Sequence, residues 1–247
     1  YNYGQSCTVN AVPNAGYTFV NWTKNGTVVS TSASYTFTVT GTATLVANFS
    51  VSPYTITVAA EPAECGTVTG GGSFVYGQTC NLVATPNVGF AFVNWTKNGA
   101  VVSTNANYSF TVTESADYVA HFATAQYTIT VLAQPVEGGV VYGAGTYDYG
   151  TIRSLRAEPN DGYSFVNWTK DGEVISTDAI LAIIVREDAE YVAHFKKDAY
   201  EITAQTDPTG AGSIMGIGFY DYGQICTLTV NPYTGYEFIN WTLDGEV

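Results

Sequence analysis

The chain has 247 residues, of which 46% are hydrophobic, 14% aromatic and 12% charged, and this composition excludes an intrinsically disordered chain. Its formal net charge of −13 argues against nucleic-acid binding, because contacts to the phosphate backbone require a basic surface. The sequence contains no run of about 18 or more apolar residues, so we expect no membrane span within it.

One pattern recurs along the chain with a period of 73 residues, most visibly as FVNWTKNG at 19–26 and its relatives at 92–99, 165–172 and 238–245. Self-similarity at a fixed period indicates tandem modules. We therefore divide the chain into module 1 (1–50, truncated, without opening strands), module 2 (51–123, complete), module 3 (124–196, complete) and module 4 (197–247, truncated, without closing strands). Because the outer repeats are incomplete and the linkers short, we expect an elongated rod that is part of a longer array.

The predicted elements follow the same order in each copy. In module 2, apolar and polar residues alternate along 54–58, 80–84, 108–112 and 117–122, which is typical of strands with one buried face. A Gly-rich segment between the first two stretches predicts a bend where another backbone approaches closely. The one helix-compatible stretch, 179–185 in module 3, aligns with a strand in the other copies. We predict all-β modules of about five or six strands, nearly or entirely without helix.

Between the second and third of these stretches, the FVNWTKNG motif predicts a β-hairpin. Its Asn-Gly or Asp-Gly dipeptide favours a type I′ turn, in which both central residues have positive φ angles. The turn glycines are Gly26, Gly99, Gly172 and Gly245. A two-residue loop places Trp95 opposite Val102 and Asn94 opposite Ser103, so that Trp faces the core and Asn faces solvent. We therefore predict four core anchors, with stacking of these rings on sugars as the alternative: Trp22, Trp95, Trp168 and Trp241.

The cysteines, histidines and carboxylates give little indication of a catalytic or metal-binding site. Cys65 and Cys80 lie on either side of the Gly-rich segment, so they could form a disulfide in an oxidising compartment. His121 and His194 share one repeat position between inward-facing residues, which predicts a solvated place on the outer face. No Cys/His cluster has metal-ligand spacing and no carboxylate recurs in all four copies, so we expect no metal, no cofactor and no enzyme activity. The residues leave calcium binding and N-glycosylation open.

The repeated pattern Gly-Tyr-x-Phe-x-Asn-Trp-Thr-x-Asn-Gly, followed by Tyr-x-Phe-x-Val and a closing Ala-x-Phe, resembles the divergent internalin-type B-repeat family of bacterial surface proteins. The match covers essentially the whole chain. In module 2 it is carried by Gly89, Phe90, Phe92, Asn94, Trp95, Gly99, Tyr108, Phe110, Val112, Ala120 and Phe122. The resemblance implies extracellular tandem β-modules, for which a β-grasp-like fold is one option, and it transfers no catalytic residues.

These observations predict a structural and interaction protein, a stalk or filament segment of a bacterial extracellular or cell-surface protein. The alternative is an adhesin region that binds a glycan or a host protein through surfaces that vary between repeats. The expected partners are neighbouring repeats of the same chain, other copies joined head to tail by strand addition, or a glycan or protein ligand.

Overall fold

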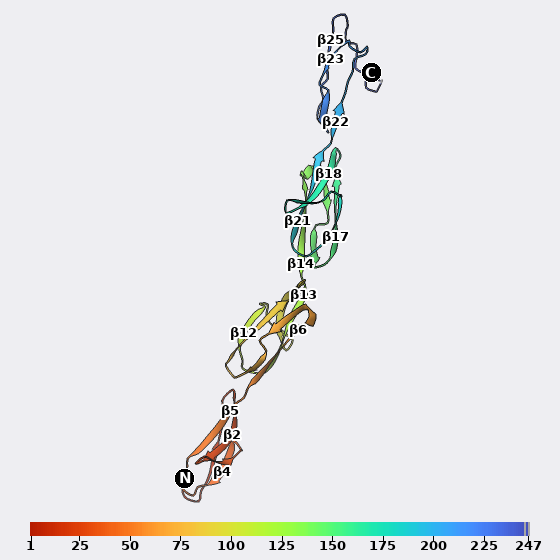
Figure 1. Cartoon of the computed structure of the whole chain (residues 1–247). Helices are drawn as coiled ribbons and strands as arrows, with labels where there is room; N and C mark the ends of the chain where they lie inside the picture. Colours follow the sequence, from red (N-terminus) through yellow and green to blue (C-terminus); the bar gives the residue numbers. More distant parts are fainter. Residues whose placement is uncertain (245, 247) are drawn as a thin grey trace. The chain divides into compact units, whose positions relative to one another are not determined.

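A computed structural model describes residues 1–244 and 246 of the chain (Figure 1). The chain divides into two compact units. Unit 1 (1–125) contains modules 1 and 2 and the first two residues of module 3, and unit 2 (126–247) contains the rest of module 3 and module 4. No helix among the described residues is both long and apolar enough to cross a membrane. Gly245, the predicted turn glycine of module 4, lies outside the described residues.

Module 2 consists of two sheets. The larger sheet has the strand order β11-β10-β13-β6-β8 and is formed by β6 (Tyr54–Glu61), β8 (Gly72–Phe74), β10 (Phe90–Lys97), β11 (Ala100–Ser103) and β13 (Ala116–Thr124). The smaller sheet has the order β12-β9-β7 and is formed by β7 (Gly66–Thr69), β9 (Thr79–Pro86) and β12 (Asn107–Thr111). A short 3-10 turn, η1 (Ala63–Cys65), connects β6 to β7 and carries the chain from one sheet to the other.

Module 3 repeats this arrangement in unit 2. Its larger sheet has the order β16-β14-β21-β18-β19, formed by β14 (Gln126–Gln134), β16 (Gly145–Asp148), β18 (Tyr163–Lys170), β19 (Glu173–Ser176) and β21 (Ala189–Lys197). Its smaller sheet has the order β15-β17-β20, formed by β15 (Gly139–Tyr142), β17 (Ile152–Pro159) and β20 (Ile180–Ile184). The turn η2 (Val136–Gly138) corresponds to η1. Residues 179–185 thus contain the strand that the alignment of copies predicts.

The outer modules contain subsets of the same elements. Module 1 has β1 (Ser6–Asn10), β2 (Tyr17–Lys24), β3 (Thr27–Ser30), β4 (Ser34–Thr38) and β5 (Leu45–Val51). Module 4 has β22 (Ala199–Ile202), β23 (Gly212–Met215), β24 (Gly218–Asp221) and β25 (Thr229–Pro232). The sheets are β3-β2-β5 and β1-β4 in module 1, and β22-β24 and β23-β25 in module 4.

The core of each complete module lies between its two sheets. In module 2, Leu82 of the smaller sheet is 1% exposed, and Trp95 and Ala120 of the larger sheet are 0% exposed. Burial raises the pKa of Tyr118 to about 12, so this phenol stays protonated at pH values at which an exposed tyrosine ionises. Module 3 has a separate core of equivalent residues, among them Leu155, Trp168 and Ala193.

The prediction of an all-β chain is confirmed, because the described residues form strands and two 3-10 turns but no α-helix. Each complete module has eight strands rather than five or six, because the segment around the Gly-rich bend forms two further short strands, β7 and β8 in module 2 and β15 and β16 in module 3. The helix that a β-grasp fold packs across its sheet has no counterpart among the described residues. The smaller sheet covers the core in its place.

The predicted hairpin turn is present, but its predicted register is wrong by one residue. Asn98 and Gly99 have φ angles of 50° and 84°, as a type I′ turn requires. Trp95 nevertheless pairs with Ser103 rather than Val102, because the ladder is interrupted by a bulge between Trp95 and Thr96. The hairpins of modules 1 and 3 have the same bulge.

The disulfide that the sequence leaves possible between Cys65 and Cys80 is absent, since both are free thiols. The register of β7 and β9 explains why. Gly66, the neighbour of Cys65, pairs with Pro86, six residues along β9 from Cys80. Six residues of strand span roughly 20 Å, whereas the Cα atoms of a disulfide lie about 4.4–6.8 Å apart. The Cys80 thiol instead donates a hydrogen bond to the carbonyl oxygen of Gly70 at 3.3 Å.

Candidate functional site

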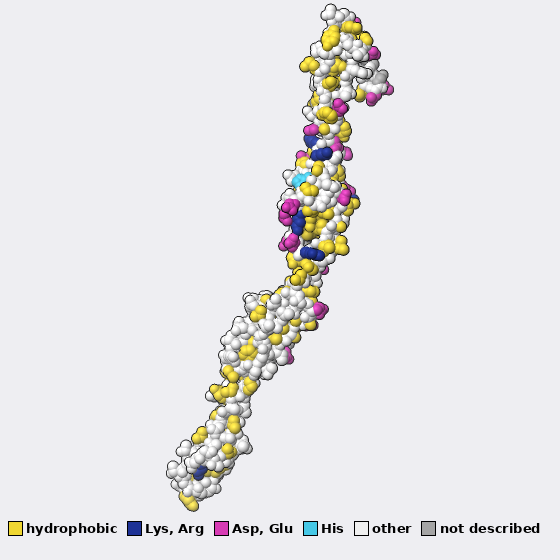
Figure 2. Space-filling view, in the orientation of Figure 1, with side chains coloured by type: hydrophobic (Ala, Val, Ile, Leu, Met, Phe, Trp, Pro, Cys, Tyr) yellow, Lys and Arg dark blue, Asp and Glu magenta, His cyan; other side chains and the backbone are white. Residues whose placement is uncertain are grey.

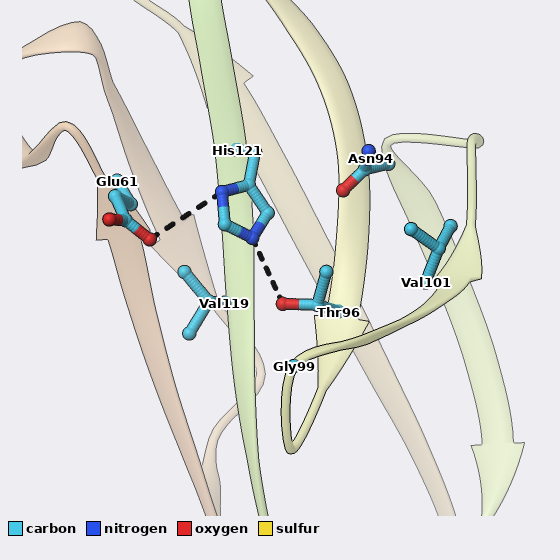
Figure 3. Close-up of a pocket in the computed structure, with 7 residues that line it drawn as sticks. All are labelled: Glu61, Asn94, Thr96, Gly99, Val101, Val119 and His121. Carbon is cyan, nitrogen blue, oxygen red and sulfur yellow. Dashed lines mark hydrogen bonds and ion pairs between the residues drawn. The ribbon is translucent and has the colours of Figure 1, made fainter.

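The outer face of the larger sheet has an open hollow in each complete module. In module 2 the hollow has a volume of about 360 Å³ and is lined by Glu61, Asn94, Thr96, Gly99, Val101, Val119 and His121 (Figure 3). In module 3 the equivalent hollow has a volume of about 460 Å³ and is lined by Gln134, Val166, Asn167, Thr169, Gly172, Val192 and His194. Because the two hollows occupy the same repeat positions, they are the strongest candidate for a repeated functional site.

Strand alternation places these polar side chains on one face. Trp95 points into the core, so its neighbours Asn94 and Thr96 point outward from β10. His121 lies on β13 with its Cα opposite those of Asn94 on β10 and Glu61 on β6. Three adjacent strands therefore bring a carboxylate, an imidazole and an amide into one row across the sheet.

In module 2, the His121 imidazole contacts one side chain on each neighbouring strand. His121 Nε2 lies 2.9 Å from the Thr96 hydroxyl, and its Nδ1 lies 3.5 Å from a carboxylate oxygen of Glu61 (Figure 3). The His121 side chain is 32% exposed, so it is half-buried rather than solvated as the sequence predicts. In module 3, His194 makes the same 2.9 Å contact with Thr169, while Gln134 takes the place of Glu61.

The asparagine side-chain oxygen of this row has no hydrogen-bond partner among the described residues in either complete module. The side-chain oxygens Oδ1 of Asn94 and Asn167 are buried and accept no hydrogen bond from the described residues. In module 1 the position of the histidine is occupied by Asn48, whose amide donates to Asn21 Oδ1 at 2.8 Å and to Thr23 Oγ1 at 3.2 Å. The histidine of the complete modules thus replaces a residue that satisfies this oxygen.

This comparison between copies predicts a stabilising substitution. His121→Asn should raise the free energy of unfolding of module 2 by about 1 kcal/mol, because a buried acceptor gains a donor. The His121–Glu61 contact that is lost is partly exposed and contributes little. The measurement is urea unfolding followed by amide exchange in module 2. His194→Asn is the matched variant without a carboxylate partner, and a loss of stability in both modules would contradict the prediction.

Two ion pairs also recur between the complete modules. Lys97 Nζ lies 2.6 Å from a carboxylate oxygen of Glu114, and Lys170 Nζ lies 2.6 Å from one of Glu187. The hydrogen bond from the lysine lowers the pKa of each carboxyl, while the bond to Glu187 raises the pKa of Lys170. Along the whole chain, charged side chains are concentrated in the C-terminal half. Residues 1–123 contain six Asp, Glu, Lys and Arg residues, and residues 124–247 contain 23. Figure 2 shows the same contrast between the two ends of the chain.

Trp95 and Trp168 lie on the opposite side of the larger sheet from the hollows. Trp95 and Trp168 are fully buried and Trp22 is 8% exposed, so these rings do not present a face to a ligand. Their indole N–H groups donate to backbone carbonyls at 3.1–3.4 Å. Trp241 is 38% exposed. Of the predicted turn glycines, Gly99 and Gly172 reach the rim of a hollow.

The repeated sequence motif is that of a known family. The family model of the Divergent InlB B-repeat domain matches the chain four times, over residues 1–53, 56–126, 127–199 and 202–247. The chain belongs to this family. B-repeats of this family are typical of bacterial surface proteins, and this chain carries them in tandem. A comparison with curated proteins gave no match.

Proposed function

We propose that this B-repeat chain is a load-bearing stalk or filament segment of a bacterial extracellular protein, in which the modules space or connect other domains. The proposal rests on the pairing of the first and last strands of each complete module. We name this pair the terminal seam: β6 with β13 in module 2, and β14 with β21 in module 3. Both seams are parallel over six residue pairs.

A parallel seam suits a module that carries tension. Because its strands run in the same direction, the chain enters at one end of the seam and leaves at the other. Tension applied through the chain therefore loads all hydrogen bonds of the seam together in shear, instead of opening them one after another. The same geometry lets one module follow the next without reversing the chain. A tandem array of such modules would transmit force through its seams.

The proposal includes no catalytic role for the hollows. The carboxylate of Glu61 beside His121 is replaced by Gln134 in module 3, so a paired acid and imidazole is not a property of the repeat. Thr96 and Thr169 are each only 8% exposed, and their hydroxyls are held by the histidines. The imidazole–hydroxyl contact is better explained as a link between neighbouring strands.

Single-molecule pulling through the chain ends tests the proposal. We expect two high-force unfolding events, one for each complete module, each releasing roughly 200–250 Å of chain. Modules 1 and 4 should yield at lower force, because their described residues provide one strand of the seam each. A trace in which modules 2 and 3 unfold at forces no higher than the outer modules would refute a load-bearing role.

A pair of proline variants provides the matched control. Val58 and Ala59 of β6 both pair with β13, and consecutive residues of a strand direct their N–H groups to opposite sides. Of Val58→Pro and Ala59→Pro, one should therefore remove a seam hydrogen bond and lower the unfolding force of module 2 more than the other. Module 3 is the internal reference in every trace. Equal forces for both variants and the unmodified chain would contradict the role of the seam.

A further inference from the structure

The outer face of the smaller sheet in module 3 is unusually apolar. Along β17 and β20 the outward positions pair as Ile152 with Ile184, Ser154 with Ala182 and Arg156 with Ile180. The three isoleucines are 70%, 52% and 63% exposed, for Ile152, Ile184 and Ile180 respectively. Val140 and Tyr142 of β15 extend this surface and are 46% and 44% exposed. We call these residues together with Glu158 the isoleucine face.

The fold does not require these apolar side chains. The same positions of module 2 hold almost only polar residues and support the same three-stranded sheet: Thr67, Thr69, Thr79, Asn81, Val83, Thr85, Asn107, Ser109 and Thr111. An antiparallel sheet with one solvated face normally alternates apolar inward and polar outward residues, as module 2 does. Exposed apolar side chains grouped on one face of a module are typical of interaction surfaces. The isoleucine face is therefore a feature of module 3 in particular.

The shape of the isoleucine face suits packing against a copy of itself. The cross-strand row of Ser154 and Ala182 is low, and it lies between the higher row of Ile152 and Ile184 and the row that contains Ile180. In a two-fold arrangement of two sheets, the high row of each copy can enter the low row of the other. Such interdigitation of side chains is how sheets pack face to face in β-sandwiches.

The charges of the face are also self-complementary. Arg156 and Glu158 lie two residues apart on β17, with 2.8 Å between Nη1 and Oε1, and the Arg156 guanidinium covers the Tyr142 ring at 4.5 Å. The pair brings one positive and one negative group to the same face, so two copies related by a two-fold axis present opposite charges to each other. A face with charges of a single sign would instead repel its own copy.

We propose that the isoleucine face is a self-association surface, whose partner is the same face of a second copy of this chain. Three strands of about five residues present a projected face of roughly 14 Å by 17 Å. This is smaller than the roughly 800 Å² per partner of a typical stable complex, so an isolated pair associates weakly. Association strengthens when many chains stand side by side on one surface, because each contact raises the effective concentration for the next. This lateral contact differs from strand addition at chain ends, because it uses a sheet face.

Sedimentation equilibrium of the whole chain between about 1 μM and 1 mM tests the proposal. The unmodified chain should form a reversible dimer. The test variant transfers the residues of module 2 to module 3: Ile180→Asn, Ala182→Ser and Ile184→Thr. Because module 2 has these residues at the same places in the same fold, the variant should stay folded, and circular dichroism checks this. We expect its dimer dissociation constant to rise at least about tenfold.

Two further variants keep the test decisive. Ala182→Lys places a charge in the middle of the face at an exposed position and should abolish the dimer even if the triple variant folds poorly. The reciprocal transfer to module 2, Asn107→Ile with Ser109→Ala and Thr111→Ile, should strengthen association. A chain that stays monomeric up to 1 mM overturns the proposal, whatever else it binds. A dimer that is unchanged by both module 3 variants also overturns it, because its contact then lies elsewhere.

Discussion

Replacing Trp95 by Ala should unfold module 2 while module 3 keeps its native structure. The Trp95 side chain is 0% exposed, and its indole donates to the Ala106 carbonyl at 3.1 Å. Its removal leaves a large cavity, and one of the two hydrogen bonds that the Ala106 carbonyl accepts is lost, at a cost of about 3–5 kcal/mol. A module of this size has a total stability of roughly 4–11 kcal/mol, so the loss is a large part of it. Amide hydrogen exchange resolved by module measures the outcome.

The loss of structure should stay within one module, because each complete module has its own hydrophobic core. The buried cluster around Trp95 and the one around Trp168 share no residue. Trp168→Ala should therefore reverse the result, with exchange protection lost from module 3 and kept in module 2. Trp241→Ala is the surface control and should change protection little, since Trp241 is 38% exposed. Protection lost from both complete modules after either buried substitution would show coupled folding and contradict the prediction.

Much of the fold could be predicted from the sequence because its signals are local. Alternation with period two indicates strands and their buried face, whichever strand becomes the neighbour. The inward position of Trp95 and the positive φ angles of Asn98 and Gly99 follow from chemistry within a few residues. The repeat supplied further support, because 179–185 could be assigned as a strand from its equivalents in the other copies.

The parts that could not be predicted depend on distant partners. Alternation does not say that β6 pairs with β13, whose residues lie 60 positions further along the chain. The large separation of Cys65 and Cys80 could not be predicted, because it depends on the register in which β7 pairs with β9. The bulge after Trp95 was missed because the turn rule assumes an uninterrupted ladder.

The row of polar residues in the hollow was missed for the same reason. The sequence placed His121 on the outer face, but its contacts come from two other strands, with Thr96 on β10 and Glu61 on β6. A comparison of the repeats nevertheless contained a signal for these contacts. Asn48 stands at the histidine position in module 1, and Gln134 stands at the position of Glu61 in module 3. Substitutions at polar outward positions of one repeat identify where neighbouring strands exchange hydrogen bonds.

Replacing Gly70 by Ala should destabilise module 2 by about 2–6 kcal/mol, from two independent causes. Gly70 has a φ angle of 105°, a region in which a residue with a side chain is strained by about 1–3 kcal/mol. A Cβ at this position would lie 2.0 Å from the carbonyl oxygen of Asn81, and overpacking of this kind costs about 1–3 kcal/mol. The obstructing atoms belong to the backbone of β9, so no rotation of a side chain relieves the clash. Urea unfolding of the whole chain measures the loss.

Gly99→Ala separates the two causes. Gly99 also has a positive φ angle, of 84°, but a Cβ there would meet nothing within 4 Å. This variant should therefore cost only the backbone strain, and the difference between the two variants measures the close approach of β9 to the Gly-rich bend. Gly143 provides the repeat in module 3, with a φ angle of 108° and the Ser154 oxygen 2.8 Å from the added Cβ. If Gly70→Ala and Gly99→Ala cost the same, backbone strain alone explains the glycine and the bend does not depend on contact with β9.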